Sequence, residues 1–224
     1  MNKILSNIKV YDLEESLVAA GYPMRVVNEM HELLPQDFKR ANTLIKASRL
    51  NGAHGQFLTG IRVNFDVTFT NKVWVEAERY RFFEFVSSQS TMHRIAKFNL
   101  DECYNEYVDP RVIQIIKEKV REYNLLKAQY DRLKNKESQL AKDLEKLCVE
   151  RYKEILYTNP AGFRITARIT TNYRCLLNMY NQRHNHRLPE WKQFCKELCE
   201  ELPEFENFVK IYMEKENENE SKNN

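Results

Sequence analysis

Residues 79–94, RYRFFEFVSSQSTMHR, hold the side chains of this chain that are best suited to binding chemistry. Two arginines precede a run of aromatic residues, hydroxyl and amide side chains follow, and a His-Arg pair closes the stretch. Guanidinium groups hold phosphates through paired hydrogen bonds, and aromatic rings stack on flat heterocycles. The stretch therefore indicates a nucleotide or flavin site, although on spacing alone a buried aromatic segment with surface arginines accounts for it better.

The composition is that of a folded chain with little net charge. Its 224 residues suffice for one large domain, or for one domain with an appended helical piece. Lys and Arg number 35 against 32 Asp and Glu, a balance that argues against binding of nucleic-acid polymers. Residues 160–192 carry six Lys or Arg and one acid, whereas residues 193–224 carry four Lys and nine Glu. This distribution indicates an anion site followed by a solvated end.

Cysteine usage and hydropathy bear on the compartment. The five cysteines are odd in number and lack paired short spacings, which fits a reducing compartment. The N-terminal residues lack the apolar run of a signal peptide, and no window approaches the roughly 20 apolar residues of a spanning helix. We therefore expect a soluble cytoplasmic protein without a membrane partner.

The elements that must position residues 79–94 come before them. Strict alternation of apolar and polar residues over 61–69 predicts a half-buried strand, and residues 8–11 predict another. A helix is expected over 73–81, after a turn at 71–72, so that the strand delivers residues 79–94 to a sheet edge. Residues 24–47 show helical spacing that is interrupted near Pro35.

The second half of the chain reads as mainly helical. After a break at Pro110, residues 111–157 carry a heptad-like seam, and residues 135–138 divide it into two antiparallel helices. A hairpin packed on its own domain is favoured over a partner-binding coiled coil. If residues 163–183 are helical, Arg174 and Asn178 share one face. Helices are expected over 191–202 and 205–213, followed by a charged, disordered tail at 214–224.

A zinc site is the weaker interpretation of the cysteines near the C-terminus. Cys195 and Cys199 follow His184 and His186, but this spacing is not a usual zinc set, so we expect small buried hydrophobic residues and no metal. The sequence has no glycine-rich phosphate motif, no hydrolase motif and no activated cysteine. An enzyme acting on nucleotides would therefore take its difficult step from a bound cofactor.

The C-terminal third resembles a known family. Residues 171–174, TNYR, with Asn178, Arg183 and then Pro189-Glu190-Trp191, are similar to the last motif of the flavin-dependent thymidylate synthases, the ThyX family. Upstream, His54, the strand at 61–69 and residues 79–94 follow in the family's order. The resemblance covers roughly residues 50–210, with a longer helical hairpin between the motifs.

The resemblance implies an α+β fold with a central, mostly antiparallel sheet flanked by helices and an extended helical hairpin, in a single domain over 1–213. It implies a homotetramer that transfers a one-carbon unit from methylenetetrahydrofolate to C5 of dUMP, or of a related pyrimidine nucleotide, with FAD and NADPH. Implied flavin contacts are His54, Arg79, Tyr80, Arg81, Asn172, Arg174 and Asn178. Implied nucleotide contacts are Glu76, Ser88, Gln89, Ser90, Arg94 and Arg183. The implied catalytic side chains are Tyr80 and Arg183.

The central motif departs from the family pattern RHRxxSxNExSxR. Tyr80 stands in place of the His, Glu84 in place of the first Ser, and residues 86–89 in place of the Asn-Glu pair. The closing Arg is replaced by Met92 or displaced to Arg94. Two alternatives therefore stay open: a nucleotide- or flavin-binding homologue without turnover, and a structural or interaction protein that works through the hairpin.

Overall fold

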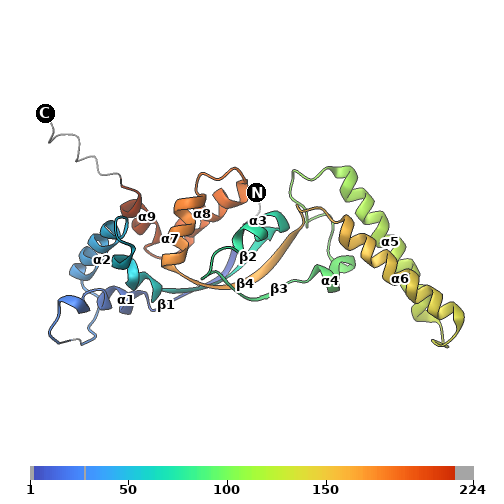
Figure 1. Ribbon diagram of the computed structural model, residues 1–224, viewed down its shortest axis with the longest axis horizontal. Helices are drawn as coiled ribbons and strands as arrows, with labels where there is room; N and C mark the ends of the chain where they lie inside the picture. The colour runs from blue at the N-terminus through green and yellow to red at the C-terminus, as the bar shows by residue number, and fades with distance from the viewer. Residues whose placement is uncertain (1–2, 28, 215–224) are drawn as a thin grey trace. The chain divides into compact units, whose positions relative to one another are not determined.

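The protein has an α+β fold built on one antiparallel sheet. The computed structural model describes residues 3–27 and 29–214. Within these residues the sheet has four strands in the order β1-β2-β4-β3 (Figure 1). The strands are β1 Leu5–Tyr11, β2 Arg62–Thr70, β3 Glu84–Ser88 and β4 Arg164–Asn172. The predicted fold class is confirmed, and β3 is an edge strand, as expected for the stretch that follows β2.

The chain divides into two compact units. The first, here the sheet–helix unit, contains the residues up to 67, residues 77–87 and the residues from 168 onward. The second, here the hairpin unit, contains residues 68–76 and 88–167. The single domain over 1–213 stays a prediction, and the expected tail lies outside the described residues from 215 onward.

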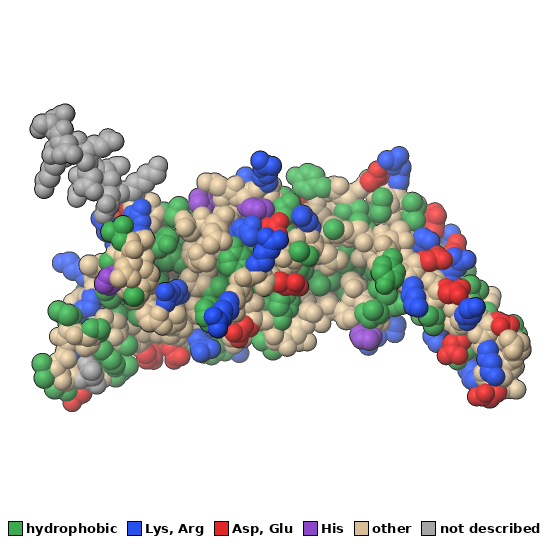
Figure 2. Space-filling view, viewed as in Figure 1, with side chains coloured by type: hydrophobic (Ala, Val, Ile, Leu, Met, Phe, Trp, Pro, Cys, Tyr) green, Lys and Arg blue, Asp and Glu red, His purple; other side chains and the backbone are tan. Residues whose placement is uncertain are grey.

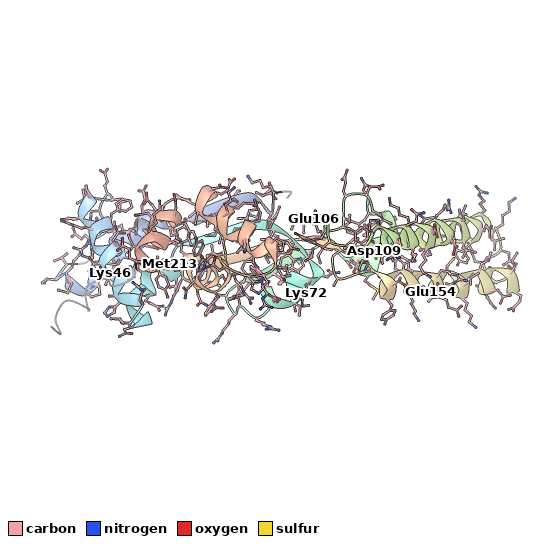
Figure 3. All side chains as sticks on the ribbon, turned by 90° about the horizontal axis from the view of Figure 1, so that it is seen from above. Lys46, Lys72, Glu106, Asp109, Glu154 and Met213 are labelled. Carbon is pink, nitrogen blue, oxygen red and sulfur yellow. The ribbon has the colours of Figure 1, made fainter. Side chains whose placement is uncertain are left out.

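Helices of the sheet–helix unit come from both ends of the chain. α2 packs against η2 and α9, and α7 packs against η2, α8 and α9. Figure 3 labels Lys46 on α2 and Met213 at the end of α9. The α-helices are α1 Leu13–Ala19, α2 Pro35–Ser48, α7 Tyr173–Arg183, α8 Pro189–Glu201 and α9 Phe205–Met213. The 3₁₀ helices, labelled η, are η1 Tyr22–Met24 and η2 Gly52–Thr59.

The alternation in β2 supplies the core of this unit. Val63, Phe65 and Val67 have no exposed surface, as the period of two predicts. The Phe65 ring lies 6.1 Å from that of Phe83 and 6.3 Å from that of Phe194, between ring centroids. Phe83 belongs to the stretch 79–94, so its burial fixes where the preceding arginines, Arg79 and Arg81, emerge.

A buried carboxylate on α8 holds the start of the chain. Glu197 is 2% exposed, and its two oxygens accept hydrogen bonds from the Ile4 and Leu5 N–H groups at 2.7 to 3.0 Å. The Gln193 amide donates to the same carboxylate at 2.7 Å. These bonds satisfy a charge that would otherwise be costly to bury, and they attach β1 to α8.

The predicted helical hairpin is confirmed in the hairpin unit. α5 Pro110–Arg132 begins at Asp109, whose carboxylate accepts from the Arg111 N–H, and α6 Gln139–Thr158 begins at Ser138, whose hydroxyl accepts from the Ala141 N–H. Figure 2 shows basic and acidic side chains interspersed over the hairpin. The core of the hairpin unit consists of Ile95, Leu100, Tyr104, Ile116, Val120, Ile155 and Phe163. The other elements are α3 Asn71–Ala77, α4 Thr91–Arg94 and η3 Ile95–Lys97.

Three expectations about secondary structure were wrong. Residues 25–34 are not helical where described, because Pro35 and the carboxylate of Asp37, which accepts from the Leu34 N–H at 3.1 Å, set the helix start at Pro35. Residues 164–172 form β4 rather than a helix, and α3 begins at Asn71 instead of following a turn. The helix α1 was missed.

Candidate functional site

A pocket of about 1000 Å³ lies within the sheet–helix unit. It is formed by η2, the start of β2, residues 79–84, the end of β4 and the start of α7. Four chain segments far apart in sequence thus meet here, since Tyr212 of α9 also lines the pocket. The volume is at the upper end of the range of about 300 to 1,000 Å³ that is usual for small-molecule sites, so the pocket can accept a ligand of dinucleotide size.

In the described part of the chain, four arginines and one carboxylate line this pocket. Arg62 and Arg79 have no ion-pair partner among the described residues, and the Arg81 guanidinium lies 5.6 Å from the centroid of the Phe82 ring. The fourth, Arg174, donates to the Gly52 carbonyl at 3.0 Å. Unpaired guanidinium groups around a pocket create a positive potential, which favours an anionic ligand with phosphate-like oxygens.

The amides that line the pocket use their oxygens within the protein. Asn172 caps α7 by accepting from the Cys175 N–H at 2.9 Å, and Asn178 accepts from the Gln182 amide at 3.0 Å. The Gln56 oxygen accepts from Arg174. An amide whose oxygen is engaged still offers NH₂ donors. The pocket therefore presents mainly hydrogen-bond donors, which suit carbonyl and phosphate oxygens of a ligand.

Tyr80 joins the pocket to Arg183. The Tyr80 hydroxyl accepts a hydrogen bond from Arg183 Nε at 2.8 Å and donates one to Gln182 Oε1 at 2.9 Å. The Arg183 guanidinium also lies over two rings, 5.6 Å from the Tyr80 centroid and 4.9 Å from that of Trp191. Because Trp191 is fully buried, these contacts hold Arg183 in one orientation.

The one thiol in the pocket lining is not an activated nucleophile. Burial raises the pKa of Cys175, and this effect outweighs the lowering by hydrogen bonds with Thr171 and the Phe82 backbone. The thiol is therefore neutral near pH 7. Burial likewise raises the pKa of Cys195 to about 12. In the part of the chain that the structure describes, no group of three or more His, Cys, Asp or Glu is arranged to hold a metal ion.

Most of the expected flavin contacts come together in this pocket. Its lining includes Arg79, Tyr80, Arg81, Asn172, Arg174 and Asn178. His54 is on η2 and exposed, and it does not line the pocket although its neighbours Gly55 and Gln56 do. Arg183 does not line the pocket, but it contacts the lining residue Tyr80 through a hydrogen bond.

The remaining expected nucleotide contacts belong to the hairpin unit. Gln89 accepts from the Thr166 N–H through its side chain and donates its own N–H to the Thr166 carbonyl, both at 2.9 Å. The backbone N–H and the side-chain oxygen of Gln89 therefore extend the pairing of β3 with β4. Glu76 on α3 is partly buried, and Arg94 on α4 is exposed. The same unit also contains Ser88, at the end of β3, and Ser90, just before α4.

Arg62 and Gln56 are among the lining residues that sequence reasoning missed. Arg62 opens β2 and faces away from the buried side of that strand, and Gln56 lies on η2 next to His54. The alternation in β2 did mark Arg62 as a residue of the polar face. No local motif marks Gln56, whose place depends on its contact with Arg174, 118 residues later in the chain.

Comparison with known proteins supports the fold. No protein-family model matches the chain, and no curated protein matches it by sequence. Two crystal structures of flavin-dependent thymidylate synthase ThyX from Helicobacter pylori, both with FAD and dUMP, match with a TM-score of 0.62 and 14% identity. One alignment covers 93% of this chain and 98% of the other, and the second covers 96% and 100%. The chain therefore has the fold of the flavin-dependent thymidylate synthases, as the sequence resemblance implied.

Among the described residues, no helix is both long and apolar enough to cross a membrane.

Proposed function

We propose that the chain is a divergent enzyme of the flavin-dependent thymidylate synthase type. It transfers a one-carbon unit from methylenetetrahydrofolate to C5 of dUMP, or of a related pyrimidine nucleotide, with FAD and NADPH, as a cytoplasmic homotetramer. The observation that carries the proposal is the pocket of the sheet–helix unit, where unpaired arginines and amide donors surround a space of about 1000 Å³. The shared fold supports it, because the matching ThyX structures hold FAD and dUMP.

The pocket residues fit a flavin dinucleotide. Arg62, Arg79 and Arg81 would bind its pyrophosphate, and the NH₂ groups of Asn172 and Asn178 would donate to the carbonyl oxygens of its ring. Bound FAD, once reduced, supplies the hydride for the reaction. The neutral Cys175 leaves the pyrimidine without an attacking thiolate, which agrees with a reaction that uses no enzyme nucleophile.

Arg183 would bind the nucleotide phosphate through its guanidinium group, whose Nε donates to the Tyr80 hydroxyl. Since Tyr80 and Trp191 hold its planar group, little side-chain entropy is lost when the phosphate binds. Glu76, Ser88, Gln89, Ser90 and Arg94 stay proposed nucleotide contacts by resemblance to the family motif.

The test is the absorbance spectrum of the purified protein, followed by titration with FAD. We expect a flavin spectrum that survives dialysis, or saturable uptake of added FAD. Arg79→Gln and Arg174→Gln should each weaken FAD binding about tenfold or more, because each removes a charge-assisted contact. The control Arg132→Gln, at the exposed end of α5, should bind FAD normally.

Turnover is tested separately with dUMP, NADPH and methylenetetrahydrofolate. A methylated nucleotide product supports the enzyme. Flavin and dUMP binding without any product would instead support a binding homologue. A colourless protein that takes up no FAD would refute the flavin site itself.

A further inference from the structure

Among the residues that the structure describes, Glu84 is the one carboxylate that lines the pocket of the sheet–helix unit. It is the first residue of the edge strand β3, and its side chain is exposed. Two arginines of the same lining, Arg79 and Arg81, are close to it in sequence. Nevertheless, in the described part of the chain neither a hydrogen bond nor an ion pair engages the Glu84 carboxylate. The pocket thus combines many free donors with one free anionic acceptor.

An unpaired carboxylate changes which ligands can bind in a pocket that otherwise offers hydrogen-bond donors. It repels the phosphates that the arginines attract, so a ligand that binds only through anionic oxygens gains nothing from it. An ionised carboxylate accepts hydrogen bonds with both oxygens, and such charge-assisted bonds are roughly twice as strong as neutral ones. Two adjacent hydroxyl groups match these two oxygens better than a single ring N–H does.

We propose that Glu84 binds the vicinal hydroxyl groups of a ribose in the ligand, while the arginines hold the neighbouring pyrophosphate. The same pairing of an acidic side chain with ribose hydroxyls and of donors with pyrophosphate is used by unrelated dinucleotide-binding folds. This inference rests on the proposed flavin-dinucleotide site, and it makes Glu84 a specificity residue for the ribose-containing half of the ligand.

The experiment uses the full chain with two small probes that represent this half of the ligand. ADP carries the pyrophosphate and the vicinal hydroxyls, and 2′-deoxy-ADP lacks one hydroxyl. We expect isothermal titration to show that the wild-type protein binds ADP about 10- to 100-fold more tightly than 2′-deoxy-ADP, since a hydrogen bond to a charged group is lost. In Glu84→Gln the preference should fall below about threefold.

A matched control removes a nearby charge outside the pocket. Glu78→Gln, six residues earlier and exposed, changes the net charge equally and should keep the full preference for ADP. Far-ultraviolet circular dichroism and thermal melting should be the same for both variants. Equal binding of the two probes by the wild type, an unchanged preference in Glu84→Gln, or no binding of either probe would overturn the proposal. If Glu84 only moderates the arginines, Glu84→Gln would tighten both probes by one common factor, which also overturns it.

The outcome can be separated from that of the proposed function. Uptake of FAD together with equal binding of both probes would leave the flavin site standing and refute the role of Glu84. A preference for ADP that depends on Glu84, in a protein that takes up no FAD, would support the ribose contact and refute the flavin proposal.

Discussion

The Arg183 Nε donates a hydrogen bond to the Tyr80 hydroxyl across 2.8 Å, although the two residues are 103 positions apart in the chain. Tyr80 stands where the ThyX-like motif has a histidine. The residue that departs from the first motif therefore holds Arg183, which belongs to the second motif. The Tyr80 hydroxyl is used twice, since it also donates to Gln182. The two motifs are therefore physically coupled through this tyrosine.

Replacing Tyr80 tests this coupling. Tyr80→Phe keeps the ring beneath the Arg183 guanidinium but removes the acceptor of its Nε–H. We expect the Kd for dUMP to rise about 5- to 50-fold while FAD affinity stays within about twofold, because the lost bond involves a charged donor. Isothermal titration with each ligand measures both effects. Tyr80→His, whose ring nitrogen can accept the same bond, should lose less, and equal losses in both variants would contradict the coupling.

Glu197 should be a major contributor to the stability of the sheet–helix unit. Glu197→Ala leaves the buried Ile4 and Leu5 N–H groups without their acceptor, and we expect a loss of about 2 to 4 kcal/mol in the free energy of unfolding. Urea denaturation measures it. Glu200→Ala, on the exposed face of α8 with a pairing to Lys196 at 3.6 Å, should cost less than about 0.5 kcal/mol. Similar losses for the two variants would refute the assignment.

Protonation of Asp37 in acid should make the protein less stable. Its buried carboxylate lies 3.0 Å from His31 Nε2 and 3.3 Å from Arg25 Nη2. Burial raises its pKa, but the Leu34 N–H, His31 and the charge of Arg25 outweigh burial and hold the pKa below its usual value. A lowered folded-state pKa stabilises the protein above the unfolded value of about 4, and this stabilisation is lost as the pH falls through the folded pKa.

Urea denaturation of the wild type and Asp37→Asn between pH 3 and pH 7 checks this prediction. The variant should be less stable than the wild type at pH 7, by about 2 to 3 kcal/mol, and the difference should shrink toward pH 3. A difference that is independent of pH would contradict it. The pKa of Asp66 is lowered mainly by the Asn7 amide and less by Arg168. Asp66 therefore adds equally to the acid sensitivity of the wild type and of Asp37→Asn.

Two neighbouring isoleucines on α5 test the core of the hairpin unit. Ile116 is fully buried in that core, whereas Ile115 is 45% exposed. Ile116→Ala should destabilise the protein by about 2 to 4 kcal/mol because it removes buried methyl groups and leaves a cavity. Ile115→Ala should change the stability by less than about 0.5 kcal/mol. Thermal denaturation that ranks them in the opposite order would show that α5 is packed in another register.

Elements with a regular period were predictable from the sequence. The alternation in β2 and the seam of the hairpin α5–α6 are local patterns, and both were placed within a few residues. In β4 the same alternation exists, since Ala167, Ile169 and Thr171 are buried and the residues between them are not. It was missed because Ala167 and Thr171 stand where large apolar residues would mark the buried face. β3 is exposed at every position and so carries no pattern at all.

The candidate site was predictable only where it is motif-like. The order of Asn172, Arg174 and Asn178 indicated flavin contacts, and the fold brings these residues to the same pocket as Arg79 and Arg81. Whether the NH₂ groups of Asn172 and Asn178 are available to a ligand depends on the hydrogen bonds that their side-chain oxygens accept, and these follow only from the tertiary structure. The helix expected before Pro35 is absent because the buried Asp37 binds residues of the preceding loop, and helical spacing carries no information about these contacts.

The bonds from Glu197 to Ile4 and Leu5 also set an order for biosynthesis. Ile4 and Leu5, the first residue of β1, leave the ribosome before α8, and the acceptor for their N–H groups is made 192 to 193 residues later. Strand β1 pairs with β2, which follows about 50 residues behind it in the chain. The N–H groups of Ile4 and Leu5 thus lack their acceptor until α8 is made, so we expect chaperone contact with the nascent chain to concentrate at this strand.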